Sequence, residues 1–203
     1  AASDVYKRQK EYTIIEKNSL KLGIIGIVGQ DADGVAPNAK PVSFSKQIKT
    51  VQRLTDKLKN EEKVDLVILL SHSGFYPNEK GVYEGEDLKI AEKVKNLDVI
   101  ISGHTHVSTE KAIKVNNTII VQTGAYVKNL GRLELNIENK KIKNYNFSLI
   151  QLNDKILGDE EVNSLIDKHK ADIDEKYFKP YGLSYSLPIG ETDYTMKTCL
   201  LYT

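Results

Sequence analysis

Two stretches decide the fold of this chain: Val64-Asp65-Leu66-Val67-Ile68-Leu69-Leu70-Ser71-His72-Ser73-Gly74 and Leu97-Asp98-Val99-Ile100-Ile101-Ser102-Gly103-His104-Thr105-His106. Each begins with a short apolar run rich in branched residues and ends in small polar residues that include histidine. Runs of this kind are typical of strands buried on both faces of a parallel sheet. Between them, residues 85–95 carry apolar side chains at helical spacing, which predicts a helix that connects the two strands.

A strand, helix and parallel strand in succession form a right-handed crossover. Both histidine segments are then expected to leave the sheet at the same carboxyl edge, where ligands bind in open α/β sheets. Three of the four histidines, His72, His104 and His106, therefore converge on one rim of the predicted sheet. This rim is the candidate functional site.

Size and composition limit the class of protein. With 203 residues, of which 40% are hydrophobic, the chain is long enough for one domain with a substantial core. The net charge of +1 gives no large electrostatic field, which argues against a nucleic-acid polymer or an anionic membrane as partner. No apolar run approaches the roughly 20 residues of a membrane helix.

The rest of the chain suggests further elements and boundaries. A helix is expected after Ser45 as N-cap, antiparallel strands follow His106, and Asp159 is predicted to cap a last helix. A half-domain is accordingly assigned to residues 10–157, a closing helix to 158–180, and the start of a linker to 181–198. Residues 1–9 and 199–203 resemble translated sequencing adapters and are interpreted as non-native, so the chain is expected to be a piece of a longer gene product.

The histidines suggest metal chemistry. Neutral imidazole is a good ligand for Zn, Mn and Fe. In extended backbone, residues i and i+2 point the same way, so His104 and His106 are expected to face one site, with His72 nearby. Three imidazoles suffice for one ion or for half of a two-ion site. The alternative is that they form only structural hydrogen bonds, which is how we interpret His169 in the last helix.

Three segments resemble the second half of the calcineurin-like metallophosphoesterases: Leu70-Ser71-His72-Ser73-Gly74, Gly85-Glu86-Asp87-Leu88 and Asp98-Val99-Ile100-Ile101-Ser102-Gly103-His104-Thr105-His106. The branch they resemble contains bacterial 5′-nucleotidases, UDP-sugar hydrolases and 2′,3′-cyclic-nucleotide phosphodiesterases. The resemblance implies part of a four-layer αββα sandwich, with central parallel strands and crossover helices, then antiparallel strands and a C-terminal helix.

The resemblance also implies a function. Its members hold two divalent ions (Zn, Mn, Fe or similar), and by position His72 and His104 match ligands of one ion and His106 a ligand of the other. The family's other ligands, in Asp-x-His, Gly-Asp and Gly-Asn-His segments, are absent before Tyr12. We therefore assign no catalytic residue, and we expect the intact parent, not this chain, to hydrolyse a small phosphate ester such as a nucleotide. Related proteins are exported, which implies a periplasmic or cell-surface location, although the chain contains no signal segment.

Three alternatives stay open at this stage. A related branch of the family hydrolyses a sulfur-carrier thiosulfonate on the same scaffold. A second alternative is that the chain is a non-catalytic α/β module that binds one metal ion or a partner through the same rim. The third outcome is a poorly folded piece, because a divided sheet exposes a strand edge.

Overall fold

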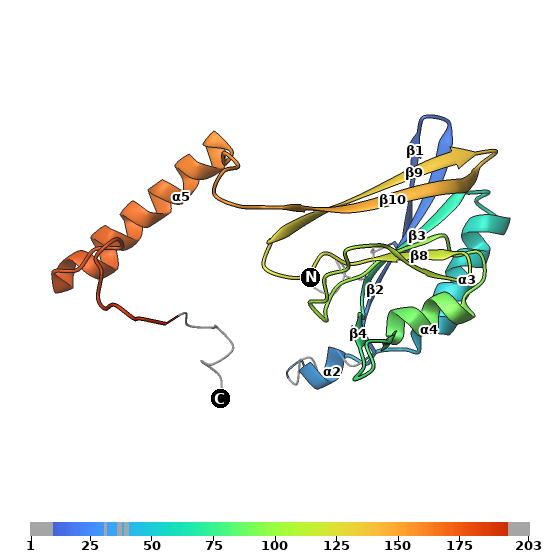
Figure 1. Ribbon diagram of the computed structural model, residues 1–203, viewed down its shortest axis with the longest axis horizontal. Coiled ribbons are helices and arrows are strands. Elements are labelled where there is room, and N and C mark those ends of the chain that lie inside the picture. Colours follow the sequence, from blue (N-terminus) through green and yellow to red (C-terminus); the bar gives the residue numbers. More distant parts are fainter. Residues whose placement is uncertain (1–9, 31, 36–37, 39–40, 195–203) are drawn as a thin grey trace. The chain divides into compact units, whose positions relative to one another are not determined.

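The computed structural model describes residues 10–30, 32–35, 38 and 41–194 (Figure 1). The chain divides into two compact units, Ala1–Asn153 and Asp154–Thr203. The two ends interpreted as non-native lie outside the described residues, as do the last residues of the predicted linker.

The first unit is built on a six-stranded sheet with the order β1-β2-β3-β6-β8-β7. Its strands are β1 (Tyr12–Lys17), β2 (Leu20–Val28), β3 (Leu66–His72), β6 (Val99–Ile101), β8 (Thr118–Val121) and β7 (Ile113–Val115). The four inner strands run parallel, whereas β1 and β7 pair antiparallel at the two margins. This confirms the predicted α/β fold with central parallel strands.

Helices α3 (Gln47–Asn60) and α4 (Glu86–Lys93) pack on one face of this sheet (Figure 1). Helix α3 buries Val51, Leu54 and Leu58 at helical spacing against apolar residues of β2 and β3. The expected N-cap Ser45 was wrong, because the helix begins after Lys46 and has no side-chain cap hydrogen bond. A short helix, α2 (Ala32–Val35), precedes it.

Two boundaries around the candidate site differ from the prediction. Strand β3 continues past the apolar run to His72, because Ser71 and His72 still pair with Ile27 and Val28 of β2. For residues 75–84 the sequence predicts a loop that overhangs the carboxyl edge, but the structure forms a small hairpin there, of β4 (Phe75–Pro77) and β5 (Tyr83–Gly85). His72 is thus held by the sheet ladder rather than by a loop.

The other face of the sheet is covered only in part. A ribbon of β9 (Asn129–Glu138) and β10 (Lys141–Gln151) packs its apolar side chains against Ile119 and Val121 of β8. In the sequence Ile142 is out of phase with Tyr145, Phe147 and Leu149, which predicts a bulge in this strand, and a register shift between Ile142 and Asn144 confirms it. Towards β2 and β3 the same sheet carries exposed apolar residues: Val28, Leu70 and Ile101, which are 52%, 45% and 45% exposed.

The second unit contains α5 (Glu160–Ile173), a π-helical turn η2 (Asp174–Phe178) and a 3₁₀ turn η3 (Lys179–Tyr181). Asp159 caps α5 as predicted, because its Oδ1 accepts the backbone N–H of Val162 at 3.0 Å. The helix buries none of its residues. That it closes the first domain stays a prediction.

Candidate metal centre

Two of the predicted histidines come together at the carboxyl edge of the sheet. His72 is the last residue of β3, and His104 lies in the loop after β6, the parallel neighbour of β3. Their rings meet edge to face, with centroids 5.1 Å apart and planes at 62°. The crossover between the strands therefore brings these imidazoles to one rim, as expected.

This spacing fits two ligands of a single ion. Two imidazoles bound to one zinc at a tetrahedral angle have centroids roughly 5 Å apart, given a Zn–N distance of about 2.0–2.1 Å. Gly103 permits the approach, since a Cβ atom there would lie 3.2 Å from His72 Nδ1. The set is nevertheless incomplete: among the residues that the structure describes, no three His, Cys, Asp or Glu side chains are grouped so as to hold a metal ion.

The third histidine is placed differently from the prediction. His104 and His106 have φ values of +73° and +59°, so the segment is not extended and the i, i+2 argument for a shared direction was wrong. The His106 ring packs against Tyr126 instead, with centroids 5.3 Å apart. Lys128 Nζ in turn lies 5.9 Å from the centre of the Tyr126 ring.

A buried carboxylate that we had not assigned any role lies behind the two histidine segments. Asp87, in the first turn of α4, accepts hydrogen bonds from Ser71 Oγ at 2.6 Å, Ser102 Oγ at 2.5 Å and the Gly74 N–H at 3.1 Å. Burial raises the pKa of Asp87, and the three hydrogen bonds oppose this effect. The sequence showed only an acidic residue at a helix start, which is common in any helix.

Gln122 is the second residue that sequence reasoning missed. In the orientation that suits its neighbours, its amide nitrogen donates to Ser102 Oγ at 3.1 Å, and its oxygen accepts the backbone N–H of His106 at 3.2 Å and of Val107 at 3.1 Å. The side chain is only 2% exposed. Gln122, the residue after β8 (Thr118–Val121), therefore holds the backbone of the loop that carries His104 and His106.

The fourth histidine belongs to the second unit. His169 lies on α5, in the second unit, and is exposed to solvent. Its interpretation as a structural residue stays a prediction.

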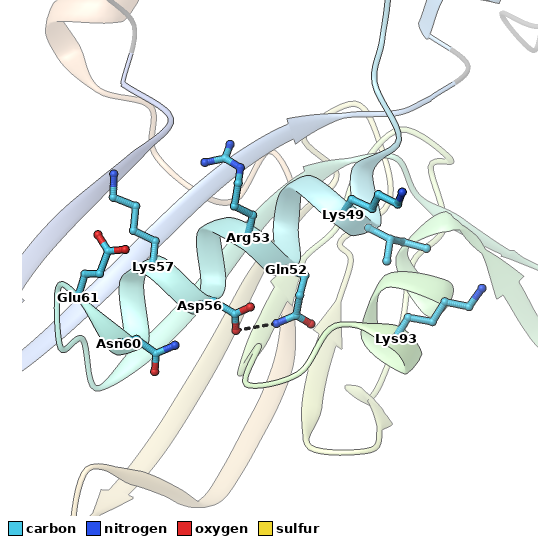
Figure 2. Close-up of a pocket in the computed structure, with 9 residues that line it drawn as sticks. Lys49, Gln52, Arg53, Asp56, Lys57, Asn60, Glu61 and Lys93 are labelled. Atoms are coloured by element: carbon cyan, nitrogen blue, oxygen red, sulfur yellow. Dashed lines mark hydrogen bonds between the residues drawn. The ribbon is translucent and has the colours of Figure 1, made fainter.

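The structure also contains a larger hollow, away from the histidine rim, which we do not assign as the functional site. It has a volume of about 770 Å³ and lies along the outer side of α3, where charged and amide side chains project to solvent (Figure 2). Gln52 donates to Asp56 at 2.9 Å, and Arg53 pairs with Glu11 at 2.6 Å. The hollow beside His72 is smaller, about 570 Å³, but it contains the imidazole. We place the functional site by this chemistry.

Comparison with known proteins supports one family. Residues 9–108, just under half of the chain, include both histidine segments and match the sequence profile of the calcineurin-like phosphoesterases. The resemblance seen in the sequence is confirmed over these residues.

Individual relatives support the same assignment. The chain is similar to the trifunctional nucleotide phosphoesterase YfkN of Bacillus subtilis (27% identity, 81% of this chain and 11% of YfkN). It is also similar to a 5′-nucleotidase of Diplobatis ommata (29% identity, 81% and 30%). Among solved structures, the sulfate thiohydrolase SoxB of Thermus thermophilus matches with a TM-score of 0.69 (26% identity, 83% and 30%). The chain thus spans less than a third of each of these proteins.

In the part of the chain that the structure describes, no helix is both long enough and apolar enough to cross a membrane.

Proposed function

We propose that this chain supplies one side of a two-metal site in a phosphoesterase that hydrolyses nucleotides. The observation that carries the proposal is the 5.1 Å spacing of the His72 and His104 rings at the ends of adjacent parallel strands. We assign these two residues to one divalent ion and His106 to the other, from their positions in the family motif. Zinc, manganese and iron all suit imidazole ligands.

In this proposal the role of the chain is to hold imidazole side chains at a fixed spacing at an open rim. The β3 ladder fixes His72, while Gln122 and Asp87 fix the loop that carries His104 and His106. Divalent ions held in part by these histidines would supply polarisation of the phosphoryl group and activation of a water molecule for in-line attack.

We further propose that the remaining ligands come from sequence outside these 203 residues. This is supported by the finding that, among the described residues, no three His, Cys, Asp or Glu side chains are grouped so as to hold a metal ion. It is also supported by the exposed side chains of Val28, Leu70 and Ile101, which lie on the sheet beside His72 and offer apolar surface for another segment to cover. Residues 10–157 then form a half-domain, 158–180 a closing helix and 181–198 the start of a linker. On this basis the chain alone does not turn over substrate.

The substrate class and the location rest on the relatives. YfkN and the 5′-nucleotidase are named for nucleotide phosphoester hydrolysis. We propose a small nucleotide as the substrate of the intact protein, and a periplasmic or cell-surface location. Hydrolysis of AMP by the product of the complete gene, with Mn²⁺ present, is the direct test.

Metal binding by this chain tests the site itself. We expect calorimetric titration with Zn²⁺ to show binding that is lost in His104→Ala and in His72→Ala. A Zn²⁺ concentration 100 times the Kd would stabilise the fold by about 2.7 kcal/mol. His169→Ala removes an exposed histidine from α5 and serves as the matched control. Equal binding by His104→Ala and His169→Ala would contradict the assignment.

A second candidate reaction is hydrolysis of a thiosulfonate, which the likeness to the sulfate thiohydrolase supports. The scaffold and the histidines would be the same, and only the reacting group would differ. Parallel assays of the complete gene product with AMP and with a thiosulfonate separate the two reactions. A non-catalytic module that binds one metal ion would show zinc binding and neither activity.

A further inference from the structure

Asp87 connects the two segments that carry the histidines. The first, which comprises the end of β3, the turn after it and the start of β4 (residues 71–75), is here called the first loop, and residues 102–107 are called the second loop. Asp87 is fully buried. Its Oδ1 accepts from Ser71 of the first loop, and its Oδ2 accepts from Gly74 of the first loop and from Ser102 of the second. The backbone N–H of Asp87 also donates to the Gly74 carbonyl at 3.2 Å. One carboxylate therefore joins both loops to the start of α4.

The choice of a carboxylate at this place needs a reason. A buried carboxylate is costly, and within the described part of the chain no cation is paired with Asp87 to offset the cost. The advantage of a carboxylate is that its two oxygens accept several hydrogen bonds at once with well-defined geometry. No single serine or asparagine side chain accepts three donors in this way.

Asp87 hydrogen-bonds two serines that lie close to the histidines in sequence. Ser71 precedes His72 directly in β3, and Ser102 is two residues before His104. A shift of either serine would move the attached imidazole relative to the other. Thr105 joins the same loops a second time, since its Oγ1 donates to the Phe75 carbonyl at 2.6 Å.

We propose that Asp87 is a positioning residue that fixes the spacing of the His72 and His104 imidazoles by hydrogen-bonding both loops at once. For its effect on metal binding, this inference rests on the proposed function. Its effect on the two loops does not. Asp87 itself is not assigned as a ligand.

A matched control exists at the opposite ends of the same strands. Asp98 accepts the backbone N–H of Val67 at 2.7 Å and pairs with Lys59 at 2.9 Å, so it ties β6 to β3 near their amino ends. Asp98→Asn also removes a carboxylate that hydrogen-bonds this pair of strands, but at the end of the strands away from the histidines. Loss of stability alone is thus common to both variants, whereas loosening of the histidine loops is expected only of Asp87→Asn.

The test compares Asp87→Asn with Asp98→Asn and the unchanged chain by hydrogen–deuterium exchange. In Asp87→Asn we expect faster exchange in the first and the second loop together. In Asp98→Asn we expect exchange in these loops to match the unchanged chain. Faster exchange in one loop only, or the same loosening in both variants, would overturn the inference. If Asp87→Asn fails to fold, Ser102→Ala removes one donor while leaving the carboxylate, and is expected to loosen both loops more weakly.

Zinc titration adds the functional readout. Removal of a residue that orients metal ligands typically lowers metal affinity by about 10–100-fold, so we expect about a tenfold loss in Asp87→Asn and none in Asp98→Asn. Unchanged zinc affinity in Asp87→Asn would overturn the metal part of the inference. An unchanged chain that binds no zinc would instead refute the proposed function, and the exchange data would still decide the role of Asp87.

Discussion

Gly74 and Thr105 approach each other so closely that no side chain fits between them: a Cβ atom on Gly74 would lie 2.4 Å from Thr105 Cγ2. Gly74 follows the first histidine closely in sequence, and Thr105 lies between the other two. The two loops therefore pack backbone against side chain. Their contact depends on the absence of a side chain at one position.

Replacing Gly74 by alanine should separate the loops. Gly74 has a φ of +81°, and the added methyl group would also meet the Gly103 carbonyl at 2.8 Å. We expect Gly74→Ala to lower the free energy of unfolding by about 1–3 kcal/mol, as overpacking does, and to weaken zinc binding. Chemical denaturation and calorimetry measure the two effects. The control is Gly81→Ala, where φ is +75° but the space is open. Equal losses in the two variants would show that backbone strain alone is responsible.

Val127 offers a change in the stabilising direction. It has a φ of +54°, a conformation that disfavours β-branched residues, and its side chain is 80% exposed. A left-handed conformation costs roughly 1–2 kcal/mol for an L-residue, and the greater freedom of glycine in the unfolded chain offsets part of the gain. We expect Val127→Gly to raise the free energy of unfolding by about 0.5–1 kcal/mol. Val82→Gly, at an exposed valine without positive φ, should not stabilise the protein.

Asp65 gives the fold a dependence on pH. The Lys21 backbone N–H, followed by the Lys140 ammonium group, holds the pKa of the Asp65 carboxyl below its ordinary value of 3.8. Because the pKa is lower in the folded state than in the unfolded state, the ionised Asp65 carboxylate stabilises the fold at pH values above its ordinary pKa of 3.8. This stability is lost as the pH falls through the folded-state pKa. We expect acid unfolding curves of Asp65→Asn to depend less on pH in this range. Glu110→Gln, which removes an exposed carboxylate, controls for net charge.

Thr55 places a hydroxyl group in the core without a partner. Its side chain is fully buried on α3, and among the described residues no group hydrogen-bonds its Oγ1. A buried polar group left unsatisfied costs about 1–3 kcal/mol. We expect Thr55→Val, which keeps the shape, to raise the free energy of unfolding by about 1 kcal/mol or more. Thr118→Val is the contrasting variant, because Thr118 Oγ1 donates to the Leu97 carbonyl at 2.8 Å and its loss should destabilise.

Much of this arrangement could be predicted from local pattern. The apolar runs ending at Leu70 and Ile101 predict parallel strands, because short apolar runs without alternation are typical of parallel sheets. From there, topology alone brings His72 and His104 to one edge. The bulge after Ile142 and the cap at Asp159 are equally local, since each depends on the phase or identity of a few neighbouring residues.

The rest depends on contacts that no local pattern shows. The direction of His106 follows from left-handed backbone at His104 and His106, in a loop whose backbone N–H groups at residues 106 and 107 are bound by Gln122, a residue 16 positions later in the chain. Asp87 is likewise indistinguishable in sequence from an ordinary acidic residue at a helix start. Its burial between two loops becomes visible only once the strands are side by side.

Ser71 and His72 are neighbours in β3, and the pleat of the strand turns them to opposite faces of the sheet. The serine is buried towards α4, where it binds Asp87, whereas the imidazole is exposed. The residue that binds Asp87 and the residue proposed to bind metal therefore lie on opposite sides of one strand. Substitutions on the open side can alter reactivity while the anchor stays intact, which allows one scaffold to diversify over evolution without losing its register.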